Sequence, residues 1–343
     1  GALYMLLESV SNVAAEEPGV SNKWKGLSAS PLVRVARTSN TQLIAADSGK
    51  WIDITSGTFT QTFAAGSILG DGWWCYLRNS GTGDITLDPS GAELIDGLST
   101  FVMYPGETRL LQCDGLTLRS VVMRPFSKTF TASGTFVKPP GYSVFESLVW
   151  SGGNSGEKSG GAGDALGGGG GGCFPARIPA SSLSATTAIT VGAGGAARTT
   201  ATTGAFGGDS SIGTLVTVKQ SALYNCGGAV MVGSEAALAA GMSTAADFGA
   251  LTSSPGGAIY GGGASSAANH SAGSIYGGGA GGSYWGGGLY TAGASSFGGA
   301  GGAAGDATNG VNGNAPGGGG GGTNTGTRSG AGARGEVRIW GAM

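Results

Sequence analysis

Very few residues of this 343-residue chain could carry out covalent chemistry. His270 is the only histidine, so a Ser–His–Asp triad would have to use it, and its surroundings, SAANHSAG, are typical of a loop. The cysteines form no CxxC pair, and with one histidine they do not suggest a zinc site. We therefore expect no catalytic residue, no metal and no cofactor, and we expect buried, reduced thiols at Cys75, Cys113, Cys173 and Cys226.

Paired carboxylates are the enzymatic alternative, because two Asp or Glu residues can cleave a glycosidic bond. No two acidic residues of the glycine-rich half are neighbours in a motif, and most are single charges near turns. The sequence therefore favours a protein that is not an enzyme. The candidates for the alternative are Glu146, Glu157, Asp164, Asp209, Glu235, Asp247 and Asp306.

Composition also narrows the partners. Charged residues make up 11% of the chain, the formal net charge is −2, and there is no cluster of Lys and Arg. Nucleic acid is therefore not an expected partner, because binding to phosphates requires concentrated positive charge.

Aromatic and amide side chains are better candidates for ligand contact, because partly exposed rings and amides can grip carbohydrates and proteins. If the glycine tracts alternate in direction, residues 283–285 and 306–316 share one end of the domain. Residues 264–276 and 289–296 then share the other end. The predicted contact residues are Tyr284, Trp285, Asn309, Asn312, His270 and Tyr290, unless Tyr284 and Trp285 merely cap the tracts.

The elements that must position these side chains are rich in glycine. The chain has 73 glycines, including runs of six at 167–172 and 317–322, with aromatics set against shorter tracts between them. An isolated extended glycine tract makes no internal hydrogen bonds and buries no side chain, so it cannot repay the entropy of its ordering. Several tracts side by side can bond to one another, and we expect a bundle of threefold, polyglycine-II-like helices capped by aromatics. The alternative is a flexible linker.

The remaining sequence predicts an all-β fold. Short segments rich in β-branched and aromatic residues follow one another between SG, GTG, PSG, DG and PG breaks. YSVFESLVW and the alternating EVRIW near the end are further strands. We expect a connecting segment at 1–40, a β-sandwich or barrel platform at 41–127 and a glycine-rich tip at 128–343. The tip would have a β framework at 128–220 and 334–341 and a glycine insertion at 221–333.

The order of these motifs resembles bacteriophage tail-fibre proteins with a glycine-rich C-terminal domain. The carrying features are FTASGTFVKPPGYSVFESLVWSGG, a six-glycine run, ITVGAGGA, GGDSSIGTLVTV and the closing GARGEVRIW. In one branch of that class, polyglycine-II helices pack in a sandwich and variable loops contact the bacterial surface. This chain departs from the branch because a β platform precedes the glycine-rich part.

The resemblance implies a receptor-binding protein that attaches a virion to its host. The implied partners are a host cell-surface receptor, either polysaccharide or outer-membrane protein, and other tail-fibre or baseplate proteins. It also implies a protein that is made in the bacterial cytoplasm and then located on the virion. The upstream β platform suggests a fused fibre tip, for which we expect a homotrimer. A structural fibre without receptor contact and a polysaccharide-degrading spike are the alternatives.

Overall fold

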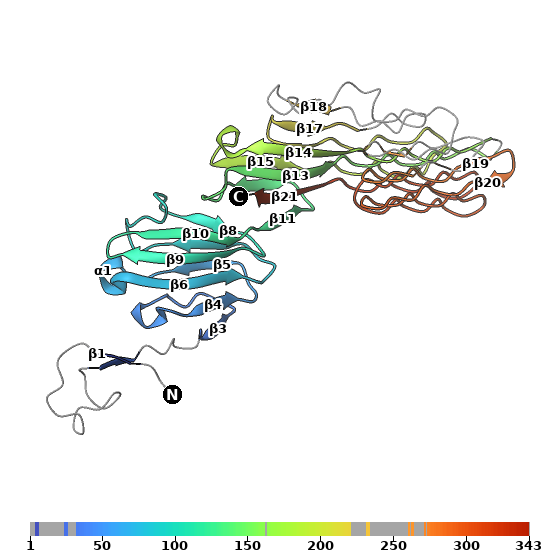
Figure 1. Ribbon diagram of the computed structural model, residues 1–343. Helices are drawn as coiled ribbons and strands as arrows, with labels where there is room; N and C mark the ends of the chain where they lie inside the picture. Colours follow the sequence, from blue (N-terminus) through green and yellow to red (C-terminus); the bar gives the residue numbers. More distant parts are fainter. Residues whose placement is uncertain are drawn as a thin grey trace. The chain divides into compact units, whose positions relative to one another are not determined.

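The computed structural model describes residues 32–161, 163–220, 260, 262–263, 271 and 273–342, and the backbone of three short strands. These strands are β1 (Tyr4–Leu6), β2 (Trp24–Gly26) and β18 (Met231–Gly233). The chain divides into two compact units, Gly1–Arg124 and Pro125–Met343 (Figure 1). Both consist almost entirely of strands and extended segments, so the predicted all-β fold is confirmed. In the described part of the chain, none of the helices has the length and hydropathy that a membrane span requires.

The first unit is a β-sandwich. A five-stranded sheet has the order β10-β9-β6-β4-β3, and a three-stranded sheet has the order β5-β7-β8. Because successive side chains of a strand point to opposite faces, alternate residues such as Cys75 and Leu77 of β6 enter one core with Leu87 and Phe101 of the other sheet. The elements are β3 (Arg34–Arg37), η1 (Ala45–Asp47), β4 (Trp51–Ile54), β5 (Phe59–Thr62), α1 (Gly66–Leu69), β6 (Asp71–Asn79), β7 (Ile85–Asp88), β8 (Phe101–Met103), β9 (Thr108–Asp114) and β10 (Leu118–Arg124).

Cys75 and Cys113 lie in this core as free thiols, and Cys173 is buried in the second unit. Burial raises the pKa of the Cys75 thiol, so it stays protonated at neutral pH. The prediction of buried, reduced cysteines is confirmed for these three. Cys226 lies outside the described residues.

The second unit begins with a β framework. One sheet has the order β11-β21-β13-β14, with all pairs antiparallel, and the other has the order β12-β15-β16-β17-β18. Phe126, Phe136, Tyr142 and Phe145 form an aromatic core with ring centroids 5.3 to 6.2 Å apart. The strands are β11 (Ser127–Phe130), β12 (Gly134–Val137), β13 (Val144–Trp150), β14 (Cys173–Pro179), β15 (Thr186–Thr190), β16 (Ser210–Ile212), β17 (Val216–Val218) and β21 (Glu336–Ala342), and η2 spans Ala180–Ser182.

After β13 the chain leaves the sheets as an extended glycine-rich tract, residues 151–159. Its main-chain N–H groups bond to three different neighbours in turn, so the direction repeats every third residue. Residues 151, 154 and 157 donate to segment 166–172, residues 152, 155 and 158 to segment 202–208, and residues 153 and 156 to segment 330–333. This period is that of an extended backbone with three residues per turn.

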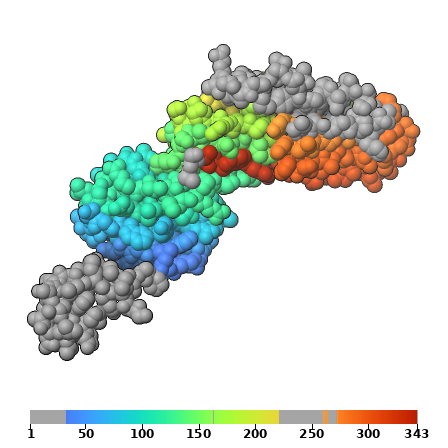
Figure 2. Space-filling model, viewed as in Figure 1, coloured from blue at the N-terminus to red at the C-terminus, as the bar shows by residue number. Residues whose placement is uncertain are grey.

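The six-glycine run near the end of the chain follows the same rule. In the tract 317–323, N–H groups of residues 318 and 321 donate to segment 311–314, those of 319 and 322 to segment 279–282, and those of 320 and 323 to segment 154–157. This tract therefore has bonded neighbours on three sides, whereas a strand in a sheet has them on two. We call the assembly of such tracts the glycine lattice (Figure 1). Figure 2 shows its segments 273–335 as one continuous mass on the face in view.

Interior positions of the lattice exclude any side chain. A Cβ on Gly168 would overlap the carbonyl oxygen of Asn154, and a Cβ on Gly321 would overlap the carbonyl oxygen of Ala303. Each such close approach therefore requires glycine on one of the two tracts, while the facing residue can be another one, as Asn154 and Ala303 are here. The close approach expected from the glycine content is confirmed at these positions.

The predicted bundle of helices is not seen. None of the described tracts is assigned as a helix, and each runs as an extended segment. The tracts keep the three-residue period expected of a polyglycine-II-like backbone, but they are extended segments held mainly by bonds to neighbouring tracts, so no bundle of helices forms. The lattice also includes tracts from 151–172 and 192–208, which come before the predicted insertion.

Aromatic rings stand where tracts leave the sheets. Tyr260, Tyr276 and Phe297 each precede a run of two or three glycines, and their rings stack with centroids 5.0 and 4.8 Å apart. Trp150, at the end of β13, donates its indole N–H to the carbonyl of Tyr276. Three of the predicted capping aromatics therefore form a ladder between the sheets and the lattice.

Candidate functional site

The lattice ends in a group of connecting segments on the side remote from the sheets. Tract 151–159 starts at the sheet, so its last residues lie at that remote end. Isolated bridges join Lys158 to Thr202 and Thr323, Ala165 to Tyr284, and Gly305 to Thr323. Segments from five parts of the chain therefore meet at what we call the distal end: 157–165, 200–204, 284–289, 305–309 and 323–328.

A two-residue hairpin projects from the distal end. It pairs β19 (Tyr284–Trp285) with β20 (Gly288–Leu289), which Figure 1 shows at the opposite end of the unit from β13 and β21. The turn residues Gly286 and Gly287 have φ of +56° and +84°, the signs that a type I′ turn requires. The hairpin presents Trp285 and Leu289, which are 38% and 58% exposed.

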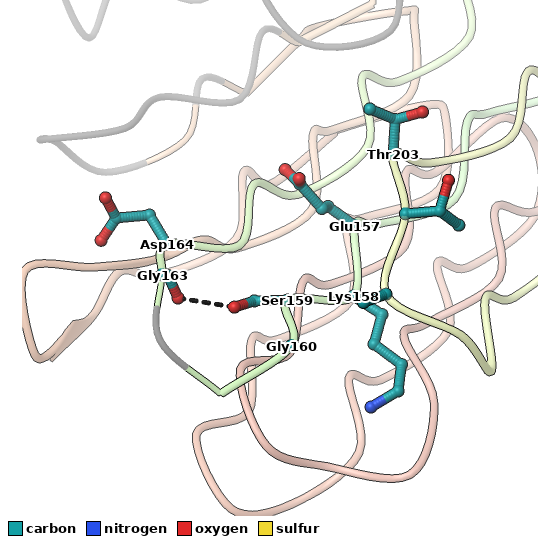
Figure 3. Close-up of a pocket in the computed structure, with 9 residues that line it drawn as sticks. Glu157, Lys158, Ser159, Gly160, Gly163, Asp164 and Thr203 are labelled. Carbon is teal, nitrogen blue, oxygen red and sulfur yellow. Dashed lines mark hydrogen bonds between the residues drawn. The ribbon is translucent and has the colours of Figure 1, made fainter.

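Beside the hairpin the distal end is hollowed. The open hollow has a volume of about 520 Å³ and is lined by Glu157, Lys158, Ser159, Gly160, Gly163, Asp164, Ala201, Thr202 and Thr203. Figure 3 shows the carboxylates of Glu157 and Asp164 directed to the same side, while the Lys158 side chain extends the opposite way. The Lys158 ammonium donates to the carbonyl of Gly326 at 2.6 Å.

Main-chain groups orient both carboxylates. Oδ1 of Asp164 accepts the N–H of Gly286 at 2.7 Å, which ties the hollow to the hairpin turn. Oε2 of Glu157 accepts the N–H of Leu166 at 3.3 Å. Burial is the main cause that raises the pKa of Glu157, the Asp164 charge raises it further, and the Leu166 N–H opposes both. Among the lining residues, two negative groups therefore share the hollow while the one cation is turned away.

Three of the predicted contact residues lie in or next to the hairpin: Tyr284 and Trp285 form its first strand, and Tyr290 follows its second. The N–H of Tyr290 donates to the carbonyl of Ser283 at 2.8 Å. Residues 284–285 and 306–309 share the distal end, as expected for the start of each predicted loop. Leu289 and Tyr290 were expected at the other end and instead lie in or next to the hairpin, because β20 pairs directly with β19. Residues 311–314 instead return along tract 317–323 toward the sheets.

The two predicted asparagines have a different position. Oδ1 of Asn309 accepts the N–H of Arg328 at 3.0 Å, and Oδ1 of Asn312 accepts the N–H of Ala331 at 2.9 Å. Their side chains thus supply the acceptor that a third neighbouring tract would supply elsewhere in the lattice. His270, the sixth predicted residue, lies outside the described residues.

Sequence reasoning missed the hollow. Glu157 and Asp164 were considered only as separate carboxylates, and Thr202 and Thr203 were not considered. The signal that could have found the site is EKSGGAGDA, residues 157–165, a charged interruption between a glycine-rich tract and a six-glycine run.

Comparison with known proteins identifies a family. The model of a family described as "Glycine-rich domain" matches residues 129–340, a range that includes the described lattice, the hollow and most of the sheets. No curated protein matches the chain.

Proposed function

The chain belongs to this glycine-rich domain family, and from that premise we propose that it is a bacteriophage tail-fibre or receptor-binding protein. The distal end of the lattice would attach the virion to the host cell surface. The receptor is a polysaccharide or an outer-membrane protein, and the other partners are tail-fibre or baseplate proteins. The protein would be made in the bacterial cytoplasm and assembled into the virion as a homotrimer.

The observation that carries this proposal is the contrast between the lattice and its distal segments. The lattice is fixed by main-chain bonds on three sides, as in tract 317–323. The distal segments carry charged and aromatic side chains, including Glu157 at the end of its tract, Asp164 and Trp285. A rigid scaffold with chemically varied loops is a common arrangement for binding proteins, because little entropy is lost when the loops meet a ligand.

The test is adsorption of the fluorescently labelled full chain to a panel of bacteria. We expect the native protein to bind at least one strain, and replacement of Trp285 and Leu289 together by alanine to weaken binding at least tenfold. Loss of two exposed apolar side chains at the centre of an interface is expected to cost about 1–2 kcal/mol each. Val311→Ala is the matched control, because Val311 is 54% exposed on a tract between the two ends.

Two outcomes would contradict the proposal. Absence of binding to every strain would favour the structural fibre. Equal binding by the double variant and the control would remove the hairpin from the contact. The polysaccharide-degrading spike is favoured by one observation, the shared hollow of Glu157 and Asp164, and release of reducing sugar from a bound strain would identify it.

A further inference from the structure

We infer that the distal hollow binds a saccharide rich in hydrogen-bond donors, either neutral or carrying an amino group, with Glu157 and Asp164 as its acceptors. This inference rests on the proposed function and names the ligand class of the same site. One sugar residue would occupy the hollow, and the saccharide chain would continue toward the hairpin. The hydrogen bond from Gly286 to Asp164 sets these two parts side by side.

Each carboxylate has one oxygen that orients it and one that is left for a ligand. In Glu157 the oriented oxygen is Oε2, bonded to Leu166, and in Asp164 it is Oδ1, bonded to Gly286. No described residue donates to Oε1 of Glu157 or to Oδ2 of Asp164. Ionised carboxylate oxygens are strong acceptors that prefer charged or hydroxyl donors. The hollow therefore offers two preoriented acceptors that sugar hydroxyls or an ammonium group would satisfy.

The remaining lining suits the same ligand. Thr202 and Thr203 are exposed and line the hollow with hydroxyl groups, which can both donate and accept. The lining includes no large apolar side chain, which argues against a lipid or an apolar peptide. At the adjacent hairpin, the partly exposed indole of Trp285 offers a flat apolar face for the next sugar ring.

Charge decides which saccharides are excluded. The ionisable groups of the lining are Glu157, Asp164 and Lys158, and the Lys158 ammonium is bonded to the carbonyl of Gly326. An anionic sugar would therefore face two carboxylates without a cation to pair with. Uronic or sialic acids should be rejected, whereas a glucosamine should be accepted because its ammonium would relieve the repulsion between the two carboxylates.

Titration calorimetry with the full chain tests this inference. The probes are oligosaccharides of neutral hexoses, of glucosamine and of galacturonic acid. We expect binding to a neutral or glucosamine probe and no binding to the galacturonic acid probe. Glu157→Gln and Asp164→Asn should each weaken binding about tenfold or more, because each removes a charge-assisted hydrogen bond. Asp209→Asn is the matched control, since this exposed carboxylate adjoins β16 at the sheet end and bonds to the N–H of Gln220.

The outcomes separate the inference from the proposed function. If native protein binds cells but none of the saccharides, the inference is wrong while the proposed function stands. If Glu157→Gln and Asp164→Asn bind the saccharides as well as the Asp209→Asn control does, the inference is wrong. It is also wrong if the anionic probe binds best. If saccharides bind as expected but no strain is adsorbed, the hollow stands and the proposed function fails. Cleavage of a bound probe would overturn a role in binding alone and would identify the polysaccharide-degrading spike.

Discussion

At the residue scale, the lattice depends on small polar side chains whose oxygens accept hydrogen bonds from main-chain N–H groups, as carbonyl oxygens do elsewhere. Oδ1 of Asn154 accepts the N–H of Gly207, and Oγ of Ser155 accepts the N–H of Ala205. Asn309 and Asn312 do the same at the edge of the lattice. Oδ1 of Asn154 satisfies a buried N–H group that would cost about 1–3 kcal/mol without a partner, whereas the bonds of Asn309 and Asn312 are exposed to solvent. Asparagine and serine therefore occur within the tracts for a structural reason, and their amide or hydroxyl groups need no ligand to explain them.

Ionisation of the Glu157 side chain lowers the stability of the folded protein. Burial and the neighbouring Asp164 raise its pKa, so the folded state holds a proton that the unfolded state has already released. Stability therefore falls as the pH rises from the unfolded pKa through the raised folded pKa. Glu157→Gln does not titrate, so the variant should match the native protein in acid and be the more stable of the two at neutral pH. Thermal denaturation between about pH 4 and pH 8 measures this difference.

Asp209→Asn is again the control, because it removes a carboxylate that does not line the hollow. A difference between native protein and Glu157→Gln that stays constant across the pH range would contradict the expected effect of burial. A stabilised variant that no longer binds saccharide would show that Glu157 is kept for binding at the expense of stability.

At the element scale, each glycine tract is held by its neighbours on several sides, so one misplaced atom disturbs several tracts. Gly168 shows this arrangement. Its N–H donates to Gly320, its carbonyl accepts from Gly281, and the Asn154 carbonyl occupies the place of a Cβ. In a sheet, a side chain would have room above or below the plane.

We expect Gly168→Ala to destabilise the second unit by about 3 kcal/mol or more, because an inserted carbon in a closely packed site costs about 1–3 kcal/mol and hydrogen bonds to two tracts are strained as well. Gly160→Ala is the matched control. A Cβ there would lie 3.5 Å from the Cβ of Ala201, which is an ordinary contact. Denaturant unfolding of both variants measures the effect. Equal stabilities would show that the tracts can move apart at little cost.

Much at the element scale is predictable from sequence. Alternation identifies β13 and β21, and glycine content with aromatic punctuation indicates tracts that bond to one another. The hollow could not be predicted, because Glu157 and Thr202 are brought together only by the long-range order of the tracts. The same applies to Asn312, whose partner Ala331 is fixed by tract register and by no local motif. The assignment of 221–333 as one insertion stays a prediction, since most of residues 221–270 lie outside the described part.

At the scale of the whole molecule, the proposed homotrimer needs a surface for self-association. The outer face of the five-stranded sheet offers one. Pairing places Val121, Leu110, Tyr76 and Trp51 in one row, and Trp74 packs edge-on against Tyr76 at 5.6 Å. Val121 and Trp74 are 59% and 38% exposed. Aromatic and aliphatic side chains of this kind are typical of the core of a protein interface.

Replacement of Trp74 and Val121 together by serine should therefore dissociate the proposed trimer. Sedimentation equilibrium should give three chain masses for the native protein and one for the variant. Leu116→Ser is the control, because Leu116 is 74% exposed in the turn after β9, outside this row. A native protein that sediments as a single chain would contradict the trimer itself. A variant that remains trimeric would place the interface elsewhere.

The position of β21 has a consequence for how the protein reaches this structure. β21 lies between β11 and β13, yet in the chain it follows every tract of the lattice. The framework can close only when segments separated by most of the second unit meet. Such remote pairing slows folding far more than it reduces the stability of the folded state. Acquisition of the native state should therefore be slow and all-or-none, because a chain interrupted anywhere within the tracts would be left with its central sheet open.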